Sequence, residues 1–162
     1  MDELLKIALP ISTFFLGAWL NAVRVASSEN IEQLNEIIDE IKSIELLAVD
    51  YWSDSRNDES PRAEVMIKGG MFLLSKLMSA TDGLYGDLDF LSMRCLDDFV
   101  DAVTGGTFET ISRNADLGRA MDVRRAAAEL VVVTRRRRFE LSSPAAVGAR
   151  VRDIWQGIFP RH

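Results

Sequence analysis

Three aspartates have the residue type and spacing in this chain that most resemble a catalytic or metal-binding site. Asp97, Asp98 and Asp101 spell the pattern D-D-x-x-D, a compact cluster of carboxylates. The same cluster has an ordinary structural interpretation, in which the aspartates form the solvent face of an amphipathic helix and Phe99 points inward. We favour the structural interpretation, because patterns of five residues recur by chance.

The pattern resembles the aspartate-rich motif of isoprenyl diphosphate synthases. The resemblance implies carboxylates one helical turn apart on one face, holding Mg²⁺ against a diphosphate. It covers five residues, whereas those enzymes are helical barrels nearly twice as long with a second acidic motif that this chain lacks. A Mg-dependent diphosphate enzyme acting through Asp97, Asp98 and Asp101 is therefore a distant alternative, and we expect no enzyme.

Other catalytic and metal-binding chemistry has no support in the sequence. His162, the only histidine, is the final residue of the sequence, which argues against a Ser-His or Cys-His pair. With Cys95 as the only cysteine, we expect no Cys/His zinc site either. A Gly-rich phosphate-binding loop between a strand and a helix is missing as well. We therefore expect no catalytic residues, no metal and no cofactor.

Four consecutive arginines, Arg135, Arg136, Arg137 and Arg138, form the second candidate site. We expect them to contact the acidic face of residues 27–59 within the same chain, where exposed pairs add little stability. Anionic lipid is the next interpretation, because basic side chains are attracted to a negatively charged leaflet. Nucleic acid is the least favoured partner, because only Phe139 lies close enough to stack on a base.

An uncharged segment, Ile7–Val23, lies between Lys6 and Arg24. As a helix it is about 25 Å long at ~1.5 Å per residue, and snorkelling of the flanking charges extends it to about one bilayer crossing. A cleaved signal peptide is disfavoured because the residues before the segment are net negative. The sequence predicts a membrane helix, with an apolar helix buried in a soluble core or against a partner as the alternative.

The predicted membrane helix carries its own interface. Thr13, Gly17 and Asn21 follow at four-residue spacing on one face, and small or polar residues at this spacing let two membrane helices approach closely. We therefore expect a homo-oligomer.

The charges of the chain are distributed unevenly. Residues 27–104 hold seventeen acids and six bases, a net charge of −11, while residues 105–162 hold six acids and eleven bases, a net charge of +5. The basic residues after the membrane segment and the lone cysteine favour a chain whose bulk faces the cytoplasm from the inner membrane.

Helical periodicity accounts for most of the remaining chain. A break at Ser27–Asn30, with Asn30 and Gln33 as a capping box, precedes an amphipathic helix over residues 31–52. After a polar loop, Ser60-Pro61 starts a helix reaching Thr81, and we expect Gly69-Gly70 to pack closely on the preceding helix. The expected inward residues of these two helices are Ile31, Leu34, Ile38, Ile41, Ile44, Leu47, Ala48, Tyr51 and Trp52, followed by Val65, Phe72, Leu73, Leu74, Leu77 and Met78.

Three more helices are expected. One spans residues 88–103 and is ended by Gly105-Gly106, one spans Asn114–Arg138, and one starts at Ser143-Pro144. We prefer a helix to a strand at residues 130–134, because no second strand is visible. The expected inward residues are Leu88, Leu91, Cys95, Phe99 and Val103, then Leu117, Met121, Ala128, Val131 and Val132.

The sequence as a whole predicts an all-α protein: a membrane or apolar anchor helix over residues 1–26 and a helical bundle over 27–162. Within the bundle we expect an acidic hairpin at 27–81 and further helices, with a basic end, at 87–162. The favoured function is a single-pass, membrane-anchored interaction protein whose cytoplasmic bundle binds a protein partner or itself. The alternative is a membrane-perturbing toxin or defence protein acting through oligomerised N-terminal helices.

Overall fold

The computed structural model describes residues 2–55, 57, 59–81, 84–111 and 113–142. Its α-helices are α1 (Asp2–Ser53), α2 (Ser60–Ala80), α3 (Asp89–Thr104) and α4 (Leu117–Ser142), and a 3-10 turn, η1 (Gly86–Leu88), precedes α3. No strand occurs in these ranges, so the expected all-α class is confirmed and residues 130–134 are helical. The helix expected from Ser143 onward lies outside the described residues.

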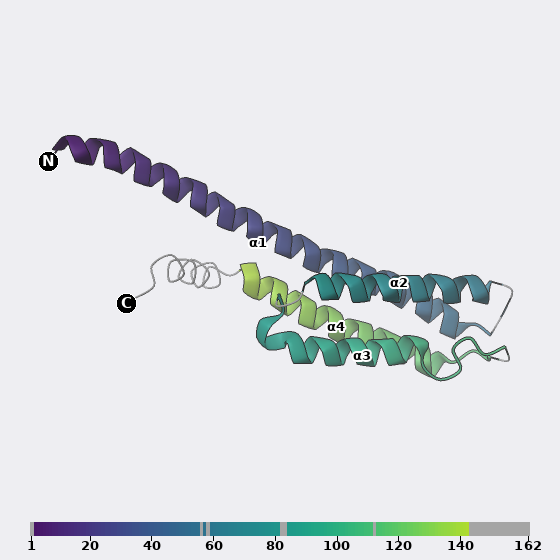
Figure 1. Ribbon diagram of the computed structural model, residues 1–162. Coiled ribbons are helices and arrows are strands. Elements are labelled where there is room, and N and C mark those ends of the chain that lie inside the picture. Colours follow the sequence, from purple (N-terminus) through teal and green to yellow (C-terminus); the bar gives the residue numbers. More distant parts are fainter. Residues whose placement is uncertain (1, 56, 58, 82–83, 112, 143–162) are drawn as a thin grey trace. The chain divides into compact units, whose positions relative to one another are not determined.

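The chain divides into two compact units. Residues Gln33–Phe139 form one, and the residues before and after it form the other. In the first unit α2, α3, most of α4 and the second half of α1 make a four-helix bundle in which successive helices run in opposite directions (Figure 1). The predicted domain boundary after residue 26 stays a prediction.

Helix α1 corrects one sequence prediction. The break and capping box expected at Ser27–Asn30 are absent, because α1 is continuous through these positions. Glutamate favours a helix, serine and asparagine are only mildly unfavourable inside one, and this stretch holds neither glycine nor proline to end it.

No helix in the described part of the chain has both the length and the apolar character that a membrane crossing requires. Most side chains of Ile7–Val23 lie outside the described residues, so the anchor helix stays a prediction.

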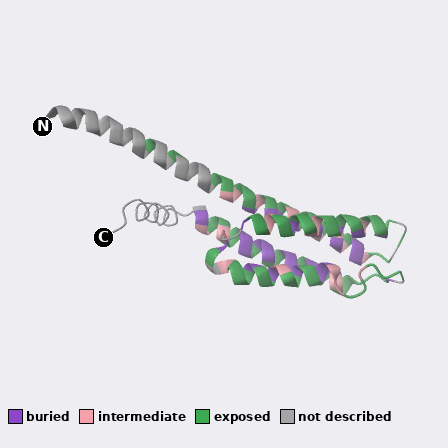
Figure 2. Cartoon of the chain, in the orientation of Figure 1, coloured by how far each residue is buried: buried purple, intermediate pink, exposed green. Residues whose placement is uncertain are grey.

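The inner face of α1 supplies many of the core residues of the bundle. The predicted apolar face of this helix is confirmed. Apolar residues recur every third or fourth position, and nearly all of them are buried against the other helices (Figure 2). The buried α1 residues are Leu34, Ile37, Ile38, Ile41, Ile44, Ala48, Tyr51 and Trp52. Acidic side chains such as Glu36 and Asp39 lie on the opposite, exposed side.

Helices α1 and α2 form the expected antiparallel hairpin, and Gly70 fixes how closely they pack. A Cβ placed on Gly70 would lie 2.8 Å from Ile44 Cγ1 and 2.9 Å from Glu40 Oε1, whereas Gly69 faces open space. The predicted close packing is thus confirmed at Gly70. In the loop before α2, Asn57 Oδ1 accepts hydrogen bonds from the backbone N–H groups of Glu59 and Ser60, both at 3.0 Å.

The prediction for the inner face of α2 is wrong, because the helix turns a different side toward the core. Leu74 is buried as expected, but Val65, Phe72 and Leu73 are exposed. The buried α2 residues are Ser60, Glu64, Ile67 and Leu74. Because Glu64 accepts a hydrogen bond from the buried Tyr51 hydroxyl at 2.9 Å, a polar contact on this side helps to orient α2.

The expected inner face of α4 is also wrong. Val131 is buried as expected, but Leu117, Met121, Ala128 and Val132 are exposed. Helix α4 instead buries a second stripe, made of Leu130 and of small or β-branched residues: Ala120, Val123, Ala126, Ala127, Val133 and Thr134. In α3 the expected burial of Cys95, Phe99 and Val103 is confirmed, while Leu91 is exposed.

Candidate functional site

The outer face of α4 is an apolar stripe that the bundle leaves uncovered. Val132 is 63% exposed although its neighbour Val133 is only 7% exposed, so the two valines mark the outer and inner sides of one helix. The spacing of four and seven residues keeps the stripe on one side over almost the whole helix. Its members are Leu117, Met121, Ala128, Val132 and Phe139, all exposed.

The inner side of α4 explains why the outer side stays free. Val123 and Leu130 fill the core, and Thr134 satisfies its hydroxyl there by donating to the Leu130 carbonyl at 2.9 Å. The Tyr85 and Thr134 hydroxyls form a further buried hydrogen bond of 3.2 Å. Burial raises the pKa of Tyr85, which therefore stays neutral in the core. These contacts fix the rotation of α4 and direct the larger apolar side chains to solvent.

A shallow apolar hollow of about 370 Å³ follows the seam between α3 and α4. Leu91 and Cys95 line it from α3, and Ala128, Val132 and Val133 line it from α4. Burial raises the pKa of the Cys95 thiol, and the nearby carboxylates of Glu129 and Asp98 raise it further. The thiol is therefore mostly protonated at neutral pH and forms a small apolar part of the hollow's wall.

A second hollow on the same seam, of about 330 Å³, is polar. Its charged lining residues are Asp98 and Asp101 from α3, and Arg119, Asp122, Arg125 and Glu129 from α4. The Arg119 guanidinium donates to the backbone carbonyl of Asp101 at 2.7 Å, which ties the end of α3 to α4. The α3–α4 seam thus changes from apolar to charged along its length.

The three aspartates of the D-D-x-x-D pattern lie exposed on α3, with Phe99 buried behind them as the structural interpretation expects. Asp98 and Asp101 face the polar hollow, whereas Asp97 is not among its lining residues. Within the described residues no group of three or more acidic, cysteine or histidine side chains is arranged to hold a metal ion. The absence of enzyme activity stays a prediction.

The chain matches no protein-family model, no curated protein and no solved structure.

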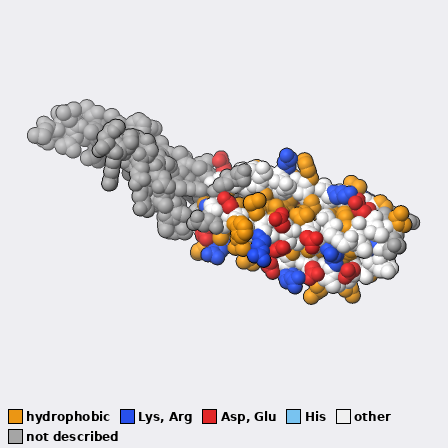
Figure 3. Space-filling model, turned by 60° about the horizontal axis from the view of Figure 1, so that its bottom comes forward, with side chains coloured by type: hydrophobic (Ala, Val, Ile, Leu, Met, Phe, Trp, Pro, Cys, Tyr) orange, Lys and Arg blue, Asp and Glu red, His pale blue; other side chains and the backbone are white. Residues whose placement is uncertain are grey.

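The outer face of α2 is the second uncovered apolar stripe. Val65, Met66, Phe72 and Leu73 are exposed on it, and Gly69 leaves open space between them. The Lys76 ammonium lies 5.5 Å from the centre of the Phe72 ring, a cation–π contact at the surface. Figure 3 shows hydrophobic side chains exposed among acidic and basic ones across one whole face of the bundle.

The four arginines of residues 135–138 point in different directions. Arg138 donates to the Asn35 side-chain oxygen at 2.7 Å, and Arg137 donates to the backbone carbonyl of Leu84. Arg135 and Arg136 are exposed. The contact of Arg138 reaches the helix that carries the acidic face but ends on a neutral amide, so pairing of the run with that face stays a prediction.

The predicted interface in the N-terminal half of α1 is described in part. Gly17 and Asn21 are exposed, and a Cβ placed on Gly17 would meet no atom within 4 Å. The side chain of Thr13 lies outside the described residues. The role of these three residues in oligomerisation stays a prediction.

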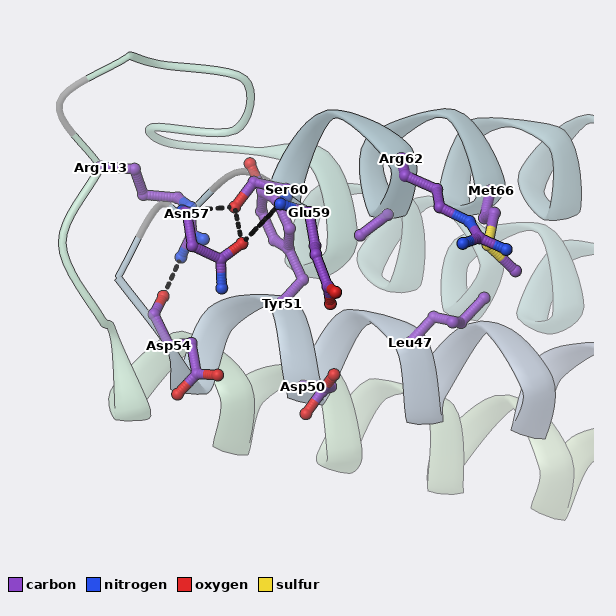
Figure 4. Close-up of a pocket in the computed structure, with 11 residues that line it drawn as sticks. Leu47, Asp50, Tyr51, Asp54, Asn57, Glu59, Ser60, Arg62, Met66 and Arg113 are labelled. Atoms are coloured by element: carbon purple, nitrogen blue, oxygen red, sulfur yellow. Dashed lines mark hydrogen bonds between the residues drawn. The ribbon is translucent and has the colours of Figure 1, made fainter.

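Sequence reasoning missed a polar cluster at the loop end of the bundle. Arg113 is 3% exposed; its guanidinium lies 3.9 Å from the centre of the Tyr51 ring and donates to the Asp54 carbonyl at 2.6 Å (Figure 4). The Tyr51 hydroxyl accepts from the Glu109 N–H at 3.1 Å, and burial is the main cause of its raised pKa. The only sequence signal for this cluster was the adjacent aromatic pair Tyr51-Trp52.

The cluster joins the loop between α1 and α2 to the loop between α3 and α4. It borders a hollow of about 240 Å³. The hollow mixes the carboxylates of Asp50, Asp54 and Glu59 with the guanidinium of Arg62 (Figure 4). No described group accepts a hydrogen bond from Arg113 Nε. Since Arg113 bonds a backbone carbonyl and lies against aromatic rings, we assign the cluster to holding the loop end together.

Proposed function

We propose that this chain is a single-pass, membrane-anchored interaction protein whose cytoplasmic helical bundle binds a protein partner or a second copy of itself. The proposed anchor is the helix over Ile7–Val23, flanked by Lys6 and Arg24. The basic residues that follow the anchor favour a bundle on the cytoplasmic side of the inner membrane.

The observation that supports the proposal is the pair of uncovered apolar stripes on α2 and α4. Both combine large apolar side chains at helical spacing, and Val65 at 70% exposure is typical of them. Several large apolar side chains exposed along one side of a helix are typical of interaction sites. Burying one such side chain in an interface is worth about 1.5–3 kcal/mol, which contributes to binding after the entropic cost of association is met.

The stripes are also preformed. They lie on helices whose opposite faces are fixed by the core, through Ile67 and Leu74 in α2 and through Val123 and Leu130 in α4. A partner therefore does not have to order a loop, which lowers the entropic cost of binding.

Site-specific photo-cross-linking in intact cells tests the proposal. A cross-linking amino acid replaces Phe72 or Val132 of the full chain, and the matched control replaces Asp39, an exposed residue of the acidic face of α1. We expect discrete cross-linked products, containing a partner or a second copy, from Phe72 and Val132 and none from Asp39. Equal background from all three positions would contradict an interaction role for the stripes.

Membrane attachment is tested on the same material. The proposal expects the full chain in the membrane fraction after carbonate extraction, and expects replacement of Phe15 and Leu16 by Lys to release it. Release of the unmodified chain by carbonate would reject the anchor and leave the interaction role to the cross-linking result.

A further inference from the structure

We propose that the outer face of α3 and α4 is the surface on which two copies of this chain pair, related by a two-fold axis parallel to the helices. The inference rests on the interaction role proposed above and identifies a second copy as the occupant of one of its surfaces. It is carried by the charges and the register of the two helices.

The exposed charges of α3 and α4 are opposite in sign. On α3 they are four acids and one base, net −3: Asp89, Asp97, Asp98, Asp101 and Arg94. On α4 they are two acids and four bases, net +2, without Arg138, whose guanidinium bonds Asn35 of α1: Asp122, Glu129, Arg124, Arg125, Arg135 and Arg136. A surface with an acidic half and a basic half is complementary to a rotated copy of itself.

The hollows on the seam give the register of α3 against α4. Leu91 and Val132 share the apolar hollow, while Asp98 and Arg125 share the polar one. Each step along α3 is thus matched by one step back along α4. These pairs give the height of each residue along the bundle axis. Once the direction of the two-fold axis is chosen, the heights determine which residues of the two copies can meet.

A two-fold axis parallel to the helices keeps every residue at its level and places α3 of one copy on α4 of the other. Phe90 then meets Val132 of the other copy, Arg94 meets Glu129, and Asp98 meets Arg125. All six side chains are exposed in the single chain. Apolar residues meet apolar ones and opposite charges meet, twice over by symmetry.

The other orientation of the axis is disfavoured. A two-fold axis perpendicular to the helices within the interface places α3 on α3 and α4 on α4, so the acidic halves face each other and the basic halves do too. Like charges held opposite one another suppress such pairings. The favoured axis also leaves Gln33, where the bundle begins, at the same end in both copies, as two anchors in one membrane require.

Charge exchange between copies tests the pairing in the full chain, purified in detergent and observed by analytical ultracentrifugation. We expect Asp98→Arg and Arg125→Asp each to weaken self-association about tenfold, because two attractive pairs become repulsive. An equal mixture of the two variants should recover the affinity of the unmodified chain. Within each variant chain the two charges stay alike, so recovery reports a contact between copies.

Two further measurements keep the test decisive. Lys76→Asp, a charge reversal on the outer face of α2, is the matched control and should leave association unchanged. In a Cys95→Ser background, a Phe90→Cys copy and a Val132→Cys copy should form a mixed disulfide, even where the N-terminal helices also associate.

A mixture that associates no better than its components, without the mixed disulfide, would overturn the pairing. Cross-links from Val132 to a different protein would do the same while leaving the proposed interaction role in place. Circular dichroism of each variant confirms folding, which the exposure of both charged positions favours.

Discussion

The inner face of α1 and the outer face of α4 both have apolar residues at helical spacing, but the first face is buried and the second is exposed to solvent. In α1 the stripe that includes Ile41, Ile44 and Trp52 is buried against the other helices. In α4 the stripe that includes Met121 and Val132 is exposed. Hydrophobic spacing therefore shows that a helix has an apolar side, but not whether its own chain or another molecule covers that side.

The difference between the two helices lies in their second faces. Outside its stripe, α1 carries mainly acidic residues such as Glu36 and Asp39, so only one side of it is suited to the core. Helix α4 has a second apolar side built from Ala120, Ala127 and Leu130. Small residues there let α4 approach its neighbours closely, and the larger residues are left for the surface.

The largest effect is expected in α1. Trp52 is fully buried, and its indole N–H donates to the Val103 carbonyl at 3.0 Å. Trp52→Ala should lower the free energy of unfolding by about 3–5 kcal/mol, measured by urea denaturation. Leu46→Ala, on the same helix at 72% exposure, is the control and should change it by no more than about 0.5 kcal/mol. Similar losses at both positions would contradict the assignment of the inner face.

An intermediate effect is expected at the two glycines of α2. Gly70→Ala should destabilise the bundle by about 1–3 kcal/mol, because the new methyl group lies 2.8 Å from Ile44 Cγ1. Gly69→Ala should stabilise it by up to about 1 kcal/mol through helix propensity, since its Cβ meets open space. Thermal unfolding of the two variants separates the faces of α2, and a reversed order would place the core on the other side.

Much of the fold followed from the sequence for physical reasons. The helix that ends at Ser53 has one apolar stripe opposite a charged one, which leaves a single way to bury it. The start of α2 near Pro61 and the end of α3 before Gly105 follow from local backbone preferences. The rotation of α2 and α4 did not follow, because each has apolar residues on two sides and only tertiary contacts choose between them.

The candidate site was recognised only in part. The exposed aspartates of α3 and the arginines of residues 135–138 are visible in the sequence, but their position on a common surface depends on the rotation of α4. The burial of Arg113 against Tyr51 could not be anticipated, because it joins residues 62 positions apart through two irregular loops.

The most direct test compares two neighbouring valines of α4. One of them, the exposed Val132, should give the smallest change in stability. Val133→Asp places a charge in the core and should lower the free energy of unfolding by about 3 kcal/mol or more. Val132→Asp should change it by no more than about 0.5 kcal/mol, yet weaken self-association of the full chain. Equal destabilisation by the two substitutions, measured by urea denaturation, would contradict the account, because the apolar stripe of α4 would then belong to the core.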